Sequence, residues 1–135
     1  MAISDFVIGQ TAELRRTISE ADVMTFAALT GDFNPVHVDA AAALASSFGE
    51  RIVHGMLTAS LLSTVLATQL PGKGAIYLSQ SLAFLRPVKL GDTVTAHVEI
   101  TGIDPEKRRL TLATSVRNER GKNVIDGEAV VQISG

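Results

Sequence analysis

The chain has 135 residues, of which 46% are hydrophobic and 19% are charged. This length suits one domain with a core of its own, and we expect residues 1–135 to form it. The 12 Lys and Arg and 14 Asp and Glu residues give a net charge of −2. That balance argues against a nucleic-acid-binding protein, since such proteins usually carry a basic excess. No cysteine is present, which excludes disulfides, thiolate zinc sites and cysteine nucleophiles.

The N-terminal sequence does not resemble a signal peptide, because Asp5 comes early and no basic stretch precedes an apolar run. The longest apolar stretch, residues 56–70, is interrupted by Thr, Ser and Gln. It is also shorter than the about 20 apolar residues that a membrane span needs. We therefore expect a protein that has no membrane contact and acts in the cytoplasm.

The first half of the chain is rich in helix-forming residues. Residues 11–17 are predicted to form a short strand, and Ser19 to cap a helix that ends near Leu29. Asp39 can cap a second short helix, which runs through the following alanines and ends near Gly49. These elements bring the chain to its longest predicted helix.

The longest helix is predicted from Gly55 to Leu70, where a Pro-Gly pair stops it. Its polar positions are small hydroxyls rather than charges, so it is predicted to be buried nearly all round. Beyond Gly74 the apolar period changes to two, which predicts strands at 76–85, 93–100, 110–116 and 125–133, with Gly127 a possible bulge. The last three strands form an antiparallel meander, so we expect a sheet wrapped around one central helix.

The densest group of polar residues is the segment GDFNPVH at residues 31–37. Asp32 and His37 are five residues apart, which does not place them on the same face of a helix. Pro35 also forbids an ordinary helix through Asn34. The side chains can converge only if the loop curls around a shared point. From residue types alone, a turn with a structural histidine is the simpler interpretation.

A second candidate segment lies where the longest helix begins, at His54 and Gly55. Unpaired backbone N–H groups and the helix dipole favour a developing negative charge at such a position. Close packing explains Gly55 equally simply, and a hydrogen-bonded structural role is favoured for His54. The three histidines are too scattered for a recognisable zinc spacing, and neither a nucleophile elbow nor a phosphate-binding glycine loop is present.

Two segments together resemble the (R)-specific enoyl-CoA hydratases, the MaoC-like or hydratase-2 group, and especially the short members that supply polyhydroxyalkanoate synthesis. Residues 31–39 read GDFNPVHVD and match a family signature in which Asp and His are separated by four residues. Residues 52–63 read IVHGMLTASLLS and are similar to the family's central helix. The strand-rich second half fits as well. The resemblance implies an α+β hot-dog fold, an antiparallel β-sheet wrapped around a long central α-helix, usually paired as a homodimer.

The resemblance also implies a role for each matching residue. Asp32 and His37 would form the catalytic pair, and Gly55 would donate its N–H to the thioester oxygen. Ser63 would support the catalytic Asp through its hydroxyl, and Asn34 would be a further supporting residue. The family needs neither a metal nor a redox cofactor, in agreement with the absence of such motifs, and coenzyme A enters as part of the substrate.

The implied function is the reversible (R)-specific hydration of trans-2-enoyl-CoA to (R)-3-hydroxyacyl-CoA, a hydro-lyase reaction. It would link fatty-acid β-oxidation intermediates to polyhydroxyalkanoate or related acyl metabolism. A hot-dog acyl-CoA thioesterase, a 3-hydroxyacyl-[acyl carrier protein] dehydratase and a non-catalytic acyl-binding subunit are the alternatives. The paired Asp32 and His37 favour hydration. Action on a carrier protein would need a basic entrance, for which Arg86, Lys89 and Lys73 are the candidates.

Overall fold

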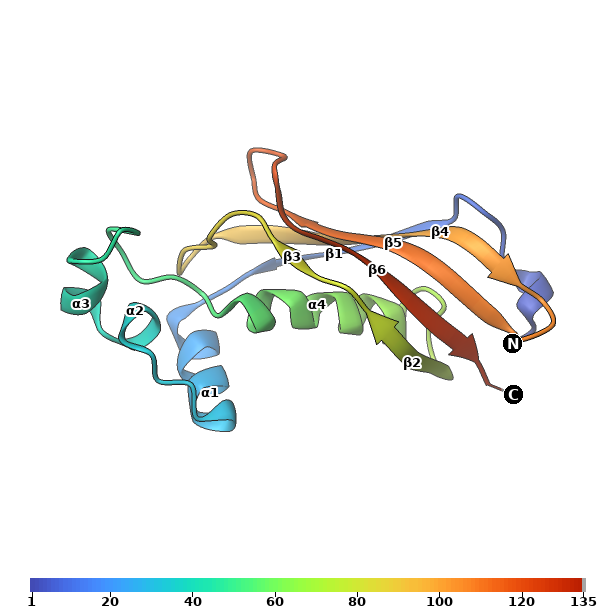
Figure 1. Cartoon of the computed structure of the whole chain (residues 1–135), viewed down its shortest axis with the longest axis horizontal. Coiled ribbons are helices and arrows are strands. Elements are labelled where there is room, and N and C mark those ends of the chain that lie inside the picture. The colour runs from blue at the N-terminus through green and yellow to red at the C-terminus, as the bar shows by residue number, and fades with distance from the viewer. Residues whose placement is uncertain (135) are drawn as a thin grey trace.

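A six-stranded antiparallel sheet curves around one long helix in the computed structural model, which describes residues 1–134 (Figure 1). The helices are α1 (Glu20–Thr30), α2 (Pro35–Val38), α3 (Ala40–Leu44) and the long α4 (Gly55–Thr68), after an N-terminal 3-10 turn (Ile3–Asp5). The strands are β1 (Thr11–Thr17), β2 (Ala75–Gln80), β3 (Ala83–Phe84), β4 (Thr93–Asp104), β5 (Arg109–Arg117) and β6 (Asn123–Ile133). This is the α+β hot-dog fold that the resemblance implied.

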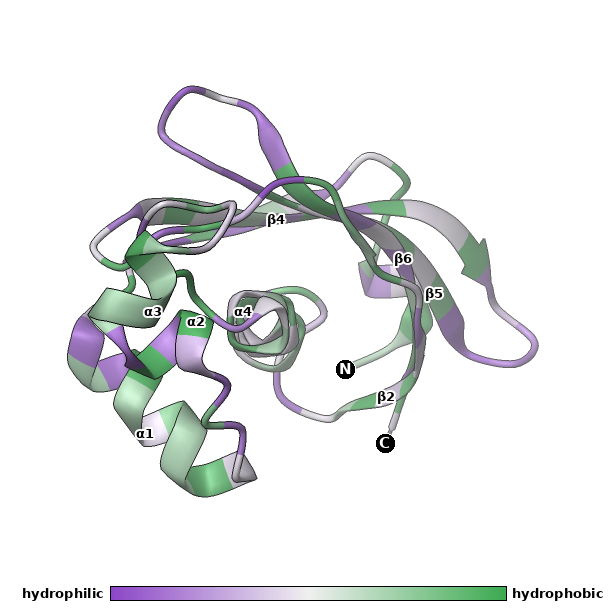
Figure 2. Cartoon of the chain, turned by 60° about the vertical axis from the view of Figure 1, so that its left-hand side comes forward, coloured by the Kyte–Doolittle hydropathy of each residue, from purple (hydrophilic) through white to green (hydrophobic). Residues whose placement is uncertain are grey.

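The sheet has the strand order β1-β4-β5-β6-β2, and β3 also pairs with β6. The predicted meander of the last three strands is confirmed, because β5 pairs antiparallel with both β4 and β6. Alternate residues of β4, from Val94 to Ile100, are fully buried, as their period of two predicts. Figure 2 shows α4 nearly end-on inside the curve of the sheet, with α1, α2 and α3 beside it. The core therefore lies between α4 and the sheet.

The single strand expected over 76–85 is wrong, because two strands, β2 and β3, occupy this stretch. The chain between them runs alongside β6, and Ser81 lies close against it. A Cβ at Gly127 would lie only 1.9 Å from the carbonyl oxygen of Ser81. Gly127 is not a bulge either, since it stays in register with Thr114 of β5. Its missing side chain instead permits the close approach of the segment that separates β2 from β3.

The short helices differ from the prediction in two places. Helix α2 was not expected, but Pro35 suits the first position of a helix, where its missing N–H costs nothing. The Asn34 side chain caps this helix by accepting from the N–H of Val36 at 3.4 Å. Helix α3 ends at Leu44, before the expected end near Gly49. Residues 31–54 therefore carry two short helices, α2 and α3, and lie beyond the N-terminal end of α4 (Figure 1).

Helix α1 begins as predicted, with Ser19 as its N-cap. The Ser19 hydroxyl accepts from the N–H of Asp22 at 3.1 Å, and the Asp22 carboxylate accepts from the N–H of Ser19 at 2.9 Å. That backbone hydrogen bond is the main reason why the pKa of Asp22 lies below its ordinary value, and Arg16 lowers it further. This reciprocal box fixes the start of the helix that carries Phe26 toward the site.

The prediction that α4 is buried nearly all round is wrong. One side of the helix and the neighbouring edge strand β2 form an exposed face, which we call the α4–β2 face. It comprises Met56, Ser60, Ser63, Tyr77 and Leu78, which line one shallow cavity. Even α4 falls short of a membrane crossing, and none of the other described helices has the length and apolar character for one.

Candidate active site

The loop between α1 and α2 is curled, and this shape brings its polar side chains together. Gly31 ends α1 in the left-handed conformation, with a φ of 80°, which glycine adopts without strain. The N–H of Asp32 then donates to the Thr30 hydroxyl at 3.3 Å. The Asp32 carboxylate accepts from the N–H of Asn34 at 3.2 Å. These local bonds hold the Asp32 side chain beside α2.

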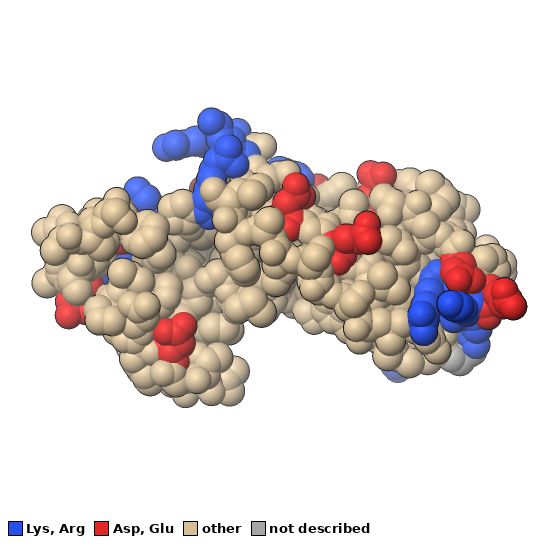
Figure 3. All heavy atoms as spheres, in the orientation of Figure 1, with Lys and Arg blue, Asp and Glu red and all other residues tan. Residues whose placement is uncertain are grey.

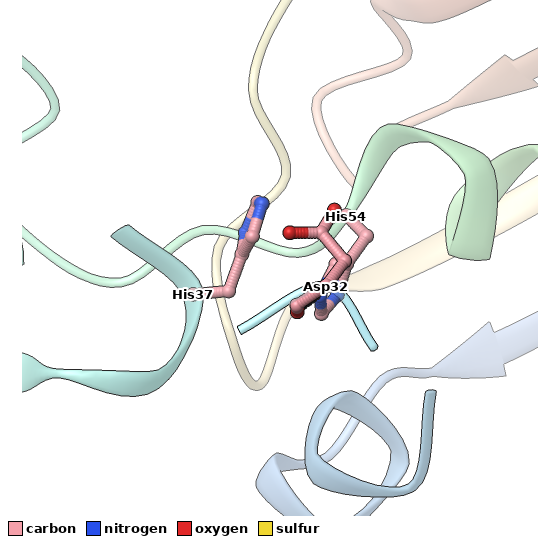
Figure 4. A group of neighbouring side chains, drawn as sticks. All are labelled: Asp32, His37 and His54. Atoms are coloured by element: carbon pink, nitrogen blue, oxygen red, sulfur yellow. Dashed lines mark hydrogen bonds between the residues drawn. The ribbon is translucent and has the colours of Figure 1, made fainter. Parts of the chain in front are cut away.

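Three side chains meet at this point: Asp32, His37 and His54 (Figure 4). One polar atom from each lies within 4.8 Å of the others. The two histidines are buried, with exposed fractions of 8% and 2%, whereas Asp32 is exposed. The structure thus brings Asp32 and His37 together, although they are not on one helical face, and it adds His54.

The hydrogen bond of His37 determines which ring nitrogen can act as an acceptor. Its Nδ1 lies 2.7 Å from the carbonyl oxygen of Ile52. Because a carbonyl oxygen only accepts hydrogen bonds, Nδ1 must carry the proton. In the neutral ring Nε2 is then the nitrogen with the lone pair. His37 is therefore prepared to accept a proton or a hydrogen bond through Nε2.

His54 connects the two sequence segments. Its Nε2 donates to the carbonyl oxygen of Asp32 at 2.9 Å, and its ring stacks on His37 with centroids 3.9 Å apart. The ring of Phe26 on α1 also packs against the ring of His54, with the two centroids 4.9 Å apart. The sequence favoured a hydrogen-bonded structural role for His54, and its hydrogen bond to Asp32 agrees with that role. Its place beside Gly55, at the start of α4, was the only signal that it would also join the candidate site. In the structure it holds the main chain of Asp32 and the ring of His37.

The same three residues are of types that ligate metals, but their geometry does not suit a metal ion. His37 Nδ1 and His54 Nε2 already bond to carbonyl oxygens. The two rings are stacked with their planes only 25° apart. A ring nitrogen binds metal in its own plane at about 2.0–2.1 Å, and planes so nearly parallel do not meet that close to the rings. The arrangement is better suited to acid–base chemistry.

Gly55 is the first residue of α4, and its N–H belongs to the first turn, which has no acceptors within the helix. It shares a cavity of about 400 Å³ with the polar group, and this cavity is lined by Phe26, Asp32, His37, His54, Gly55 and Phe84, among others. A Cβ at Gly55 would lie 2.8 Å from the Phe84 ring, so glycine also permits this ring to approach. Helix α4 therefore directs an N–H donor toward the same cavity as Asp32 and His37.

The two expected supporting residues, Asn34 and Ser63, lie at different places relative to Asp32. Asn34 contacts the Asp32 carboxylate, and Ser63 does not. Asn34 donates its main-chain N–H to Asp32, while its side chain caps α2. Ser63 lies eight residues beyond Gly55, about 12 Å along the helix at 1.5 Å per residue. It lines a different cavity, together with Tyr77 and Gln80. Within one chain, the Ser63 hydroxyl is therefore separate from the site.

Comparisons with known proteins agree with this arrangement. A MaoC-like domain matches residues 5–123. The chain is 51% identical to an (R)-specific enoyl-CoA hydratase from Rhodospirillum rubrum, over 96% of this chain and 89% of that protein. It is 48% identical to an (R)-specific enoyl-CoA hydratase from Aeromonas caviae, over 98% of this chain and 99% of that protein.

The fold agrees equally closely with a solved structure. The (R)-hydratase from A. caviae involved in PHA biosynthesis superposes with a TM-score of 0.93 and 49% sequence identity, covering 96% of this chain and 98% of that chain. A family match over most of the sequence and a full-length structural match lead to the same assignment: the chain belongs to the MaoC-like domain family.

Proposed function

We propose that this protein is an (R)-specific enoyl-CoA hydratase, a hydro-lyase that reversibly converts trans-2-enoyl-CoA to (R)-3-hydroxyacyl-CoA. The observation that carries the proposal is a single cavity that holds the Asp32 carboxylate, the His37 ring and the first N–H of α4 at Gly55. The similarity to hydratases over nearly the whole chain supports it. Asp32 and His37 are the proposed catalytic pair, and Gly55 the proposed oxyanion donor.

The reaction begins with a water molecule held between Asp32 and His37. Their polar atoms lie within 4.8 Å, a separation that one water can bridge with a hydrogen bond to each. Asp32 takes a proton from the water, whose oxygen then bonds to C3 of the enoyl group. The electron pair of the C2–C3 double bond moves toward the thioester oxygen, where the N–H of Gly55 stabilises the negative charge.

The proton taken from the water is then delivered to C2. His37 Nε2 holds the water during the addition and relays this proton. Atoms and charge balance, because the elements of one water are added and no electrons leave the substrate. The proposed reaction therefore needs neither a metal nor a redox cofactor. Each acid or base group typically contributes about 10²–10⁴-fold to the rate, and one oxyanion donor about 10²–10³-fold.

Hydration and thioester cleavage are separated by one assay. The protein is incubated with a trans-2-enoyl-CoA while the enoyl absorbance and free thiol are both followed. We expect the absorbance to fall as 3-hydroxyacyl-CoA forms, with no thiol released above the enzyme-free control. Thiol release without 3-hydroxyacyl-CoA would instead identify a thioesterase, because only cleavage of the C–S bond liberates CoA.

We propose a homodimer formed through the α4–β2 face. Strand β2 lies at an edge of the sheet, and edge strands invite pairing. Its Tyr77 and Leu78 are 41% and 43% exposed, which leaves an apolar strip beside Ser60 and Ser63 of α4. A second copy of the chain can pair its own edge strand with β2 and cover this apolar strip.

Sedimentation at micromolar concentration tests this proposal. We expect a species of twice the 14.2 kDa chain mass. Leu78→Asp should shift it toward the monomer, because it places a charge on the apolar strip. Leu44→Asp is the matched control, since Leu44 is 73% exposed on α3, beyond the far end of α4 (Figure 1). A wild-type protein that sediments only as a 14.2 kDa species contradicts the proposal.

The metabolic setting is proposed from the relatives. The similar A. caviae structure is described as involved in PHA biosynthesis. We therefore propose that this protein supplies (R)-3-hydroxyacyl-CoA to polyhydroxyalkanoate or related acyl metabolism. The substrate and the absence of cysteine from the sequence are consistent with action in the reducing cytoplasm.

A further inference from the structure

Arg51 is a largely covered cation beside the candidate active site, and the proposed mechanism gives it no role. It lies in the segment between α3 and α4, and only 15% of its side chain is exposed. Basic side chains usually keep their charged ends in water. Figure 3 shows this usual arrangement, with Lys and Arg groups projecting from the turn between β5 and β6 and from the far end of the sheet, and little basic surface over α1, α2 and α3. The covered position of Arg51 therefore needs an explanation of its own.

Each nitrogen of the Arg51 guanidinium contacts a different group. Its Nε donates to the main-chain carbonyl oxygen of His37 at 2.7 Å. Its Nη1 donates to the carboxylate of Glu20, in the first turn of α1, at 2.8 Å. Its Nη2 lies 3.7 Å from the sulfur of Met24, one turn further along α1. The planar guanidinium therefore joins α1 to the residue that carries the proposed catalytic ring.

The carbonyl group that Arg51 binds is one that helix α2 cannot satisfy by itself. Helix α2 has four residues, and the last carbonyl groups of a helix have no N–H partner within it. The N–H of Ile52 donates to the carbonyl oxygen of Val36 at 3.0 Å, and Arg51 donates to that of His37. Because a single helical turn has little stability of its own, the position of α2 depends on these outside bonds.

The residue after Arg51 holds the ring of His37. The Nδ1 of this ring donates to the carbonyl oxygen of Ile52 at 2.7 Å, and this bond leaves Nε2 free for the water. The main chain of Ile52 is itself held by a β-bridge to Lys89. Arg51 thus fixes the main chain of His37 against the same segment that fixes its ring. If α2 moved away from this segment, the Nδ1 bond would lengthen and Nε2 would leave the water.

We propose that Arg51 is a positioning residue for the hydration reaction, which acts by holding His37 in the tautomer and orientation that the water requires. This inference rests on the proposed hydratase function and adds a residue to it. The charged hydrogen bond to the His37 carbonyl carries the effect. The ion pair with Glu20 contributes little by itself, because the Glu20 side chain is 69% exposed and exposed pairs are weak.

Two variants separate the two polar bonds of Arg51. Arg51→Met keeps an apolar stem and removes every donor. It should lower kcat roughly tenfold or more and change KM for enoyl-CoA less than about twofold, because a displaced catalytic group acts on the chemical step. Glu20→Gln removes the carboxylate charge but leaves the bond between Arg51 and His37. It should lower kcat less than about threefold, as expected for an exposed ion pair.

The matched control is Arg16→Met. Arg16 of β1 also pairs with the first turn of α1, through Asp22 at 2.9 Å. Within residues 1–134, no hydrogen bond joins its side chain to α2. The control therefore removes an arginine and its ion pair with α1 without freeing His37. It should keep kcat within about twofold of the wild-type value, as expected for an exposed pair. Circular dichroism and thermal unfolding check that each variant folds.

The tautomer of His37 provides a readout that needs no catalysis. The ¹⁵N chemical shifts of a neutral histidine ring distinguish a proton on Nδ1 from one on Nε2, and the hydrogen bond of one nitrogen selects the tautomer. The chain has three histidines, so His37→Gln identifies the signals of His37 by their loss. We expect the proton on Nδ1 in the wild type and in Arg16→Met, and a mixture of both tautomers in Arg51→Met.

The inference is overturned if folded Arg51→Met keeps the wild-type kcat or the single tautomer, or if Arg16→Met loses as much kcat. A higher KM with unchanged kcat would also overturn it, because Arg51 would then serve substrate binding. If Arg51→Met does not fold, Arg51→Lys takes its place under the same criteria. Lysine has a methylene where arginine has Nε, so it cannot serve His37 and Glu20 together, and kcat should fall at least about threefold. Failure of the proposed function is distinct, since the wild type would then hydrate no enoyl-CoA while the tautomers still report on Arg51.

Discussion

Replacing Asp32 by Asn is expected to lower kcat at least about 100-fold, with a smaller effect on KM. Asn preserves the size of the side chain and can still accept from the N–H of Asn34, but it cannot take a proton from water. His37→Gln should cause a loss of similar size, because it removes the ring nitrogen that receives hydrogen bonds. The double variant should lose far less than the product of the two single losses, since both groups act on one water.

These variants are measured by the loss of enoyl absorbance, with circular dichroism to confirm folding. Ser63→Ala serves as the comparison. Its hydroxyl lies in a different cavity of the same chain, so it should cost no more than about tenfold, the size of one hydrogen bond of about 0.5–1.5 kcal/mol. A folded Asp32→Asn protein with near wild-type kcat would remove Asp32 from the mechanism.

The second large effect is expected at Gly55, where two substitutions differ by one N–H group. Proline is well tolerated at the first position of a helix, and His54 before it has a ψ of 130°, which suits the residue before proline. Both Gly55→Pro and Gly55→Ala place a Cβ toward the Phe84 ring, but only proline removes the N–H donor. We expect kcat of the proline variant to be about 10²–10³-fold below that of the alanine variant.

The alanine variant therefore controls for the displacement of Phe84. Both variants are assayed with the same enoyl-CoA, and thermal unfolding checks that α4 is retained. If the two folded variants have equal kcat, the N–H of Gly55 does not stabilise the oxyanion, and the loss belongs to the crowded ring instead.

Local elements of the fold could be predicted because their causes are local. Ser19 begins α1 through a reciprocal bond with Asp22, three residues away. Alternation with a period of two located β4, β5 and β6. The break between β2 and β3 could not be found in this way, because it accompanies a close contact between Ser81 and Gly127, which are far apart in the sequence.

The site was predictable only in part for the same reason. The spacing of Asp32 and His37 argued against convergence on a helix, and only the resemblance indicated that the loop brings them together. His54 joins the group through a bond to the Asp32 carbonyl and a stacked contact with His37, 17 residues earlier. Such tertiary contacts leave no periodic signal. Ser63 matched the family segment, yet its position along α4 places it in another cavity.

The exposed side of α4 has a similar explanation. Its hydroxyl-bearing residues, Ser60 and Ser63, suit either a buried helix or one that another surface covers, because they carry no charge. Within one chain the sheet covers only the side formed by residues such as Leu62 and Val65. The homodimer proposed through the α4–β2 face would cover the remainder.

The stereochemistry of the product tests the central claim most directly. Crotonyl-CoA is hydrated by the wild-type protein, and the 3-hydroxybutyryl-CoA formed is resolved by chiral analysis. Because Asp32, His37 and the Gly55 N–H are held in one fixed arrangement, water should reach only one face of the double bond. The account predicts the (R) product. A product that is wholly (S) would contradict it, whatever the rate.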